Sequence, residues 1–350
     1  MGKRLTVRSR ERDLRDLIHL LLIGLRGAPS IEAVSYGEGN KIVKQVQIAL
    51  FLFATLGVAG KADAQLCCTT GSASASSFEI GVTPERTLRV SFGHEYNSLN
   101  GTFVGSDRTE SNFVGSGSVQ AFTAQIHYGI TRRIGITLSA PYVKTRRSFG
   151  GGSSFGADGI GDMSFVLKYS LKPLNIASSS EIAVGSGFKL PNGSSSIDLE
   201  DDGTDLNFNL QPGTGAWDFL LWGYYYKSYL PSGWSGSVSS LIRLPGTNAD
   251  GLKYGREIFY SIVISRRLNT ISQLSFRFKG RSSSSVTIDG YENPNTGGTI
   301  TFVAPSVLWN PVRVFSLETG VDIPFLYSVS GTQQALEFRS FVDASFYFDL

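Results

Sequence analysis

The last fifteen residues of the chain alternate between apolar and polar side chains. In the segment 336–350 the even positions are apolar apart from one serine, and the odd positions include Glu337, Arg339 and Asp343. A period of two indicates a β-strand with one apolar face. Strands in soluble sheets are usually about five or six residues long, whereas a tilted strand needs roughly 9–11 residues to cross a membrane. The segment therefore predicts a transmembrane strand.

The same alternation recurs from residue 87 onward and predicts twelve strands. The predicted strands are 87–97, 118–128, 133–144, 161–171, 180–190, 216–228, 234–244, 255–266, 270–279, 299–309, 312–324 and 336–350. The connectors alternate between short turns and long segments rich in Gly, Ser and Asn. The long ones are 98–117, 145–160, 191–215, 245–254, 280–298 and 325–335.

An even number of strands with short turns at one end and long loops at the other is typical of bacterial outer-membrane barrels. Lipid offers the backbone no hydrogen-bond partner, so only a helix or a closed barrel can span it. The fold class we predict is all-β: a single antiparallel transmembrane β-barrel of about 12 strands over residues 87–350. The alternative, a large soluble β-sandwich, gives no reason for the alternation in loop length.

The composition excludes several classes of protein. Only 17% of the residues are charged and 40 of the 350 are glycine, which argues against a disordered chain and against a helical bundle. The overall charge of +3 comes from residues 1–64, which hold ten of the 32 basic and six of the 29 acidic side chains. Residues 65–350 keep 22 basic and 23 acidic side chains, a net charge of −1. Such a domain has no overall basic excess with which to bind nucleic acid.

Residues 43–64 have the layout of a secretory signal peptide. A basic residue at Lys44 precedes the apolar run Val46–Val58, and Ala62-Asp63-Ala64 forms a small-x-small cleavage site. The run is too short for a spanning helix, which needs roughly 20 residues. We therefore expect export, cleavage after Ala64 and an outer-membrane location in a Gram-negative-type envelope.

The segments on either side of the signal peptide are less ordinary. A signal peptide normally begins at the initiator Met, so residues 1–42 are interpreted as an over-extended gene start, with a cytoplasmic extension as the alternative. Residues 65–86 are expected to be a short periplasmic segment ahead of the barrel. That segment contains Cys67 and Cys68, which lack the residues that precede a lipidated cysteine and lack zinc-site spacing.

Charged residues at the polar positions of the alternating strands are expected to line the interior. They are Arg89, Glu95, Asp162, Lys168, Lys189, Arg277, Lys279, Glu318, Asp322, Glu337, Arg339 and Asp343. Because the signs are mixed, they do not form a one-signed selectivity ring. The sequence leaves two interpretations open: a polar passage, or a lumen closed by ion pairs.

No motif predicts catalysis or a cofactor. His94 and His127 are the histidines of residues 65–350, and neither belongs to a recognisable Ser-His arrangement. The acidic run Asp198–Asp205 has calcium-like spacing, but Asn209 stands where the loop needs a bidentate Glu, so a solvated loop is expected. The glycine-rich runs 150–161 and 290–298 lack the Lys-Ser/Thr of a phosphate loop. We expect no enzyme, no metal and no cofactor.

Local motifs over residues 120–350 resemble one family. These are YGITRRI (128–134) with APY (140–142), GIGD (159–162), GFKLPNG (187–193), LQPGTG (210–215) and SGTQQ (330–334). Together they are similar to the outer-membrane transporters of the phenol-degradation meta-pathway family. The chain departs from that family at its end, since many such barrels finish in an aromatic residue and this one finishes in Asp349-Leu350.

The resemblance implies an outer-membrane channel for passive transport of small, hydrophobic or aromatic solutes. The alternative is a structural or surface-interaction barrel with a closed lumen and functional extracellular loops, and an outer-membrane lipase ranks third. Expected partners are outer-membrane lipid and lipopolysaccharide, the barrel-assembly machinery through the C-terminal strand, and a small-molecule solute.

Overall fold

The protein is described here from a computed structural model. It describes residues 78–109, 114–149, 154–174, 179–195, 197, 208, 210–229 and 232–350. The predictions for residues 1–42, the signal peptide 43–64, the two cysteines and the acidic run 198–205 concern residues outside those described.

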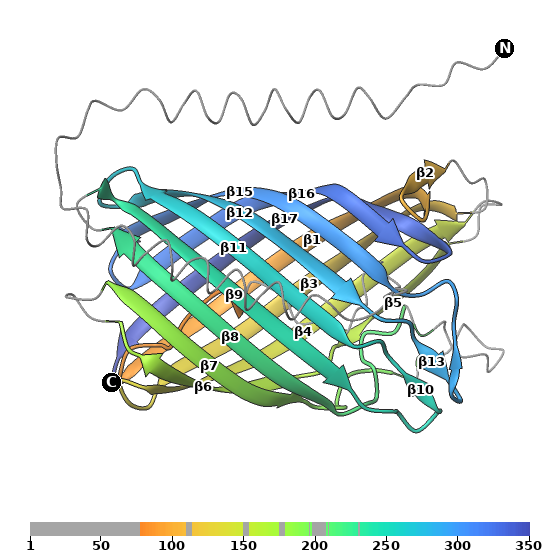
Figure 1. Cartoon of the computed structure of the whole chain (residues 1–350), viewed down its shortest axis with the longest axis horizontal. Helices are drawn as coiled ribbons and strands as arrows, with labels where there is room; N and C mark the ends of the chain where they lie inside the picture. The colour runs from red at the N-terminus through yellow and green to blue at the C-terminus, as the bar shows by residue number, and fades with distance from the viewer. Residues whose placement is uncertain are drawn as a thin grey trace, which may run out of the picture. The chain divides into compact units, whose positions relative to one another are not determined.

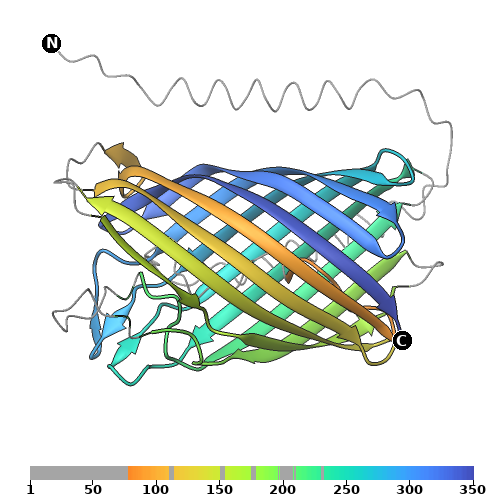
Figure 2. The same ribbon diagram turned by 180° about the vertical axis from the view of Figure 1, so that it is seen from behind.

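In the described part of the chain, twelve long strands form a closed antiparallel barrel, which confirms the predicted fold class. The strands are β1 (Thr87–Val104), β3 (Val114–Gly129), β4 (Ile134–Phe149), β6 (Ser164–Lys172), β7 (Ser180–Lys189), β8 (Asp218–Tyr229), β9 (Trp234–Pro245), β11 (Glu257–Arg267), β12 (Ser272–Ser283), β15 (Gly298–Val312), β16 (Phe315–Val329) and β17 (Thr332–Asp349). Each pairs with the next, and β17 pairs with β1 from Thr87↔Asp349 to Val104↔Thr332 (Figures 1 and 2). The alternative of a soluble sandwich is therefore wrong.

The two ends of the barrel differ as the connector lengths predicted. The end that holds Thr87 and Asp349 carries the short connectors and is called the turn end here. The opposite, loop end carries the long connectors (Figure 1). Short strands lie in those connectors: β2 (Asp107–Thr109), β5 (Ser154–Ile160), β10 (Leu252–Lys253), β13 (Thr287–Ile288) and β14 (Tyr291–Glu292). β2 and β5 extend the barrel sheet, whereas β10, β13 and β14 form a separate small sheet.

The wall has its apolar side chains outside and its polar side chains inside. On β4, Leu138 is 41% exposed, whereas its neighbours Thr137 and Ser139 are 3% exposed. On β12, Phe276 is 46% exposed beside Ser275 at 3%. This pattern is the reverse of a soluble protein, and it suits a wall whose outer face contacts lipid.

Two local predictions are corrected at the loop end. The connector predicted at 325–335 is almost entirely strand, because only Ser330 and Gly331 separate β16 from β17. Gly331 has a φ of +59°, which allows this tight turn.

The second correction concerns the start of β17. Ser98 pairs with Phe338 but Leu99 pairs with Leu336, so Glu337 is the extra residue of a β-bulge. The bulge turns Leu336 into the interior, although its even position predicted the outer face, and it leaves Glu337 exposed. Glu337 accepts a hydrogen bond from Ser98 Oγ at 3.3 Å, an arrangement that differs from the predicted lumen-lining position.

Candidate functional site

The segment 78–84, called the strap here, lies inside the turn-end half of the barrel. Three wall side chains bind its backbone: Trp222 Nε1 donates to Phe78 O at 2.8 Å, Lys168 Nζ donates to Ile80 O at 2.7 Å, and Glu181 Oε1 accepts from Val82 N at 3.0 Å. The described part of the predicted periplasmic segment thus occupies the lumen, which the sequence did not indicate.

Apolar packing also holds the strap. Phe78 is 4% exposed and packs in a cluster with Val166, Ala183, Leu220, Trp222 and Leu241, all on the inner face. Lys168 Nζ lies 4.4 Å from the centroid of the Trp222 ring, close enough for a cation–π interaction.

Glycines allow the strap to lie this close to the wall. A Cβ on Gly81 would lie 2.3 Å from Glu181 Oε2, and a Cβ on Gly129 would lie 1.9 Å from Pro84 O. Neither distance is compatible with a side chain. The glycine at each position therefore permits the contact between strap and wall.

A central group of charges crosses the interior next to the strap. Arg277 of β12 binds Glu79 of the strap through Nε at 2.8 Å, and it also pairs with Glu318 of β16. Glu79 was not among the predicted interior charges, because it precedes the first alternating segment.

Further ion pairs continue this central group. Lys279 Nζ lies 3.0 Å from Asp322 Oδ2, and Arg339 lies 3.4 Å from the same carboxylate and 3.8 Å from Glu95. Since β12 and β16 are separated by β15, the Lys279–Asp322 pair spans non-adjacent strands. A separate pair joins Arg89 to Asp343 at 3.7 Å.

A second row of charges follows the loop-end side of β6 to β12. Its members alternate in sign along Asp162, Lys189, Asp218, Arg243, Glu257 and Arg281. The predicted pair Asp162 and Lys189 are in contact, and Lys189 Nζ is also 3.3 Å from Asp218. Arg243 and Arg281 were not predicted. The parity of Arg243 in the predicted strand 234–244 offered a signal, whereas Arg281 belonged to the predicted connector 280–298, which β12 enters as far as Ser283.

The row also fixes part of the long connector between β7 and β8. Asp162 Oδ2 accepts from Thr214 N at 2.9 Å and from Thr214 Oγ1 at 2.6 Å, and Asp162 Oδ1 accepts from Gly193 N at 3.0 Å. A buried carboxylate with this many partners is well compensated. The row therefore ties the connector to the inner wall. In the next connector Tyr254 donates to Phe208 O at 3.1 Å, and burial raises the pKa of its hydroxyl.

A cavity of about 240 Å³ lies between the strap and the central charges. Side chains of both signs and several aromatic rings line it, among them Glu79, Arg277, Glu318, Tyr224, Phe341 and Tyr347. Its volume is below the roughly 300–1,000 Å³ of pockets for drug-sized ligands, so it fits a smaller molecule.

At the loop end, the inner face of the other strands, β1, β3, β4, β15, β16 and β17, is apolar. A second cluster, called the loop-end apolar cluster here, consists of Leu99, Val119, Val143, Ile300, Phe302, Val329 and Leu336. All seven are less than 8% exposed. The bulge at Glu337 contributes Leu336 to this cluster.

The two histidines lie in different settings. His127 is fully buried, with Nδ1 3.0 Å from Thr137 Oγ1 and Nε2 3.2 Å from Gln125 Oε1. His94 stacks on Phe122 with the ring centroids 4.5 Å apart.

Over the described residues, no group of three or more metal-ligating side chains occurs, and no helix there is long and apolar enough to cross a membrane.

Comparisons with known proteins identify the fold. The structure is similar to a crystal structure of an outer-membrane channel from Pseudomonas putida F1, with a TM-score of 0.62, 13% identity, and coverage of 79% of this chain and 100% of that one. Weaker similarities link it to the translocator domain of the autotransporter NalP from Neisseria meningitidis (TM-score 0.40, 8% identity, 78% and 92% coverage) and to the CymD monoaromatic hydrocarbon channel (0.36, 9%, 77% and 89%). The sequence matches no protein-family model and no curated protein. The chain thus has the fold of an outer-membrane β-barrel.

Proposed function

We propose that the protein is an outer-membrane channel for passive transport of small solutes. The observation that carries this proposal is the cavity of about 240 Å³ inside the barrel, lined by charged, hydroxyl and aromatic side chains. Barrels of eight strands are filled by side chains, and barrels of about 16 strands enclose a wide aqueous pore. A twelve-stranded wall lies between these limits and suits a narrow passage.

Whether that passage is open depends on the position of the strap. Hydrogen bonds between wall side chains and its backbone, the ion pair with Arg277 and an apolar cluster hold it, and none of these is covalent. Because the strap lies across the turn-end half of the lumen, its displacement is the simplest way to open a continuous path.

Small aromatic or hydrophobic solutes are the class we propose. The aromatic side chains around the cavity, including Tyr224, Tyr226, Phe341 and Tyr347, offer ring surfaces beside hydrogen-bonding groups. The motif resemblance points to the same class. Catalysis is not part of the proposal, since the His127 ring nitrogens are taken up by Thr137 and Gln125.

The alternative remains a barrel with a closed lumen whose loops carry the activity. One observation favours it: ion pairs and the strap fill much of the interior, and the row at Asp162 fixes a long connector to the wall. In this case the loops would contact partners outside the cell, and the interior would serve only stability.

Conductance and uptake separate the two proposals. The purified protein is placed in planar bilayers and in liposomes, and ion conductance and the uptake of phenol and of glucose are measured against empty liposomes. We expect a small conductance and faster phenol uptake. If neither the native protein nor a variant with a weakened strap conducts ions or admits phenol, the closed-lumen alternative is favoured. Uptake of glucose alone would keep the channel and discard the aromatic solute.

A further inference from the structure

Basic side chains surround the turn end of the barrel. Five connectors and the β17–β1 closure lie at this end, and each has a Lys or Arg in it or within three residues of it. One residue from each place defines the basic rim, and all but the half-buried Lys227 are exposed. The basic rim consists of Arg86, Arg132, Lys172, Lys227, Arg266 and Arg313. Positive charge is thus distributed around the circumference and is not gathered on one side.

Negative charge is scarce at the same end. The five connectors contain no Asp or Glu. In the described part of the chain, the exposed acidic side chains at this end are Asp349 and Glu85, and Glu85 pairs with Arg132 at 3.4 Å. The connector between β7 and β8 at the loop end is opposite in character, because its run 198–205 has five acidic and no basic residues. The connectors therefore differ in charge between the two ends, and the positive end is the turn end.

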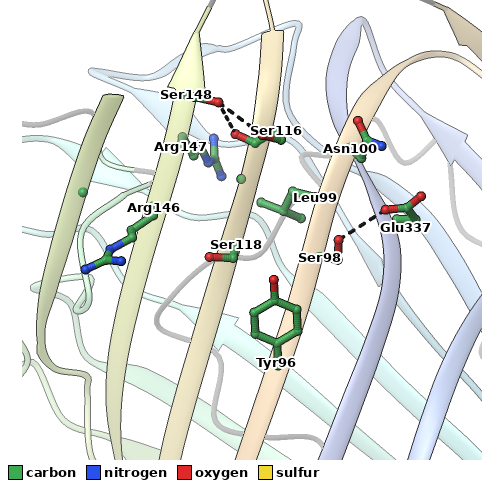
Figure 3. A pocket seen from close by; sticks show the side chains of 12 residues that line it. Tyr96, Ser98, Leu99, Asn100, Ser116, Ser118, Arg146, Arg147, Ser148 and Glu337 are labelled. Carbon is green, nitrogen blue, oxygen red and sulfur yellow. Dashed lines mark hydrogen bonds between the residues drawn. The ribbon is translucent and has the colours of Figure 1, made fainter. Parts of the chain in front are cut away.

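The outer face near the loop end carries charges of both signs. A pocket of about 590 Å³ there is lined by several hydroxyl side chains, Tyr96 and Ser98 among them, and by the charged residues Arg146, Arg147 and Glu337 (Figure 3). Ser98 Oγ donates to Glu337 Oε2 at 3.3 Å. Arg146 is exposed on this face, so it is an outer-face arginine far from the basic rim and serves as a matched control below.

Two cations of the basic rim stack on aromatic rings of the outer face. Arg266 Cζ lies 5.0 Å from the centroid of the Trp234 ring, and Lys227 Nζ lies 5.7 Å from that of Tyr229. Tyr229 pairs with Trp234 and Trp234 pairs with Arg266, so these side chains form a row across β8, β9 and β11. Aromatic side chains at the ends of a membrane wall lie at the level of the lipid headgroups. The row therefore places two cations at headgroup level.

The outer face beside this row has room for a ligand. Gly236 pairs with Lys227 on one side and with Ile264 on the other. A Cβ on Gly236 would make only an ordinary contact, with Val263 O at 3.5 Å. Ile264 is 54% exposed, so apolar surface adjoins the cations. An amphipathic molecule could place an anionic group on Lys227 and Arg266 and an apolar chain against Ile264.

We propose that Lys227, Arg266 and the rings of Tyr229 and Trp234 bind the headgroup of an anionic phospholipid in the periplasmic leaflet. The short turns of such barrels lie on the periplasmic side, and Arg and Lys form strong charge-assisted hydrogen bonds with phosphate. A lipid fits better than an acidic protein, because lipid surrounds the barrel as the basic rim does, whereas a protein partner would contact one side. The proposal goes beyond passive transport, since it concerns the outer face and holds for an open or a closed lumen.

Native mass spectrometry of the purified protein in detergent tests the site, because it resolves each bound lipid molecule by its mass. The probes are phosphatidylglycerol, which is anionic, and phosphatidylcholine, which has no net charge, with matched acyl chains. We expect tighter binding of phosphatidylglycerol. Lys227→Gln or Arg266→Gln should weaken that binding about fivefold, the contribution of one basic side chain near an anionic lipid surface, and the double variant should weaken it further.

Controls separate this site from charge in general. Arg146→Gln removes an exposed outer-face arginine at the loop end and should leave the preference unchanged. Arg266→Lys keeps the charge and should retain most of the binding. A higher concentration of ammonium acetate should weaken the preference, because exposed charges are screened. Each variant is first checked for heat-modifiable gel mobility, and Arg266→Gln alone carries the test if the double variant does not fold.

Three results would overturn the proposal. One is equal affinity of the native protein for the two lipids. Another is a phosphatidylglycerol affinity that is unchanged in the folded Gln variants of Lys227 and Arg266, or equally reduced in Arg146→Gln. The third is binding of polyglutamate that depends on Lys227 and Arg266 without any preference for phosphatidylglycerol, which would assign the basic rim to an acidic periplasmic partner. Conductance is recorded separately, so failure of the lipid site and failure of the channel are distinguishable.

Discussion

Substitution of Glu79 by glutamine should loosen the strap and increase ion conductance. Glu79 is the charged residue of the strap, and it binds the wall through Arg277 Nε at 2.8 Å. Glutamine has nearly the same size and keeps a hydrogen-bond acceptor, so the change removes mainly the charge.

The magnitude follows from the contacts that remain. Breaking a buried ion pair by removing one partner costs about 3–5 kcal/mol when the other charge is left alone. Arg277 keeps Glu318 and a hydrogen bond to Ser306, so its charge stays compensated. We therefore expect a smaller loss, about 1–2 kcal/mol, which lies between the contribution of an ordinary hydrogen bond and that of one to a charged group. If the strap equilibrates between a bound and a displaced state, a loss of this size raises the displaced fraction roughly 5–30-fold.

The assay is the fraction of time that single barrels spend in a conducting state in planar bilayers, in 1 M salt and again at low salt. Glu85→Gln is the matched control. Glu85 lies just after the strap and forms an exposed ion pair with Arg132 at 3.4 Å. Exposed pairs contribute about 0–1 kcal/mol, so this control should leave the conductance unchanged.

Two results would refute the reasoning. One is a conducting fraction for Glu79→Gln within twofold of the native protein, with the fold intact. The other is an equal increase in Glu85→Gln, which would mean that the effect arises from the charge of the N-terminal segment and not from the contact with Arg277.

Three further predictions concern other parts of the barrel. Asp162→Asn should lower the free energy of unfolding in urea by about 3 kcal/mol and speed proteinase K cleavage of the connector between β7 and β8, because it removes a buried charge that the connector binds; unchanged cleavage would contradict the anchoring role. Leu138→Arg, on the outer face of β4, should cost about 2–4 kcal/mol in folding titrations with lipid vesicles, and a midpoint equal to that of the native protein would mean that this face does not contact the membrane core. Trp222→Phe should remove a buried component of the tryptophan emission and destabilise the strap by about 1–3 kcal/mol, since Phe78 O loses its donor; emission that keeps its buried component would place the Trp222 side chain elsewhere.

The strands of the wall were predictable because one physical condition applies along their whole length. Each residue of the wall faces either lipid or the interior, so apolar and polar residues alternate along the sequence with a period of two. Leu138 and Thr137 illustrate this, since their chemistry alone assigns each to its face. The predicted strand bounds also gave the connector lengths, and the connector lengths distinguished the turn end from the loop end.

The contents of the interior were less predictable, because they depend on contacts between distant segments. The strap has no alternation, and only the positions of Trp222, Lys168 and Glu181 show that it lies inside. The bulge at Glu337 shifts the parity of its neighbour Leu336 by one residue, and no local motif marks the shift. Strand parity predicts which charged side chains face inward, but it does not predict which of them form ion pairs with one another.

The closure between β1 and β17 has a consequence for how the molecule is assembled. Thr87 and Asp349 are 262 residues apart in the chain, so their pairing is among the most non-local contacts the fold can make and requires the last strand to be present. Two residues join the strap to β1, and its Phe78 packs against Trp222 of β8. An incomplete sheet that already holds the strap in its hollow would keep the first strand within reach while the later strands are added. The segment that occupies the lumen of the finished barrel would then also act, during folding, as the tether that shortens the search for the final seam.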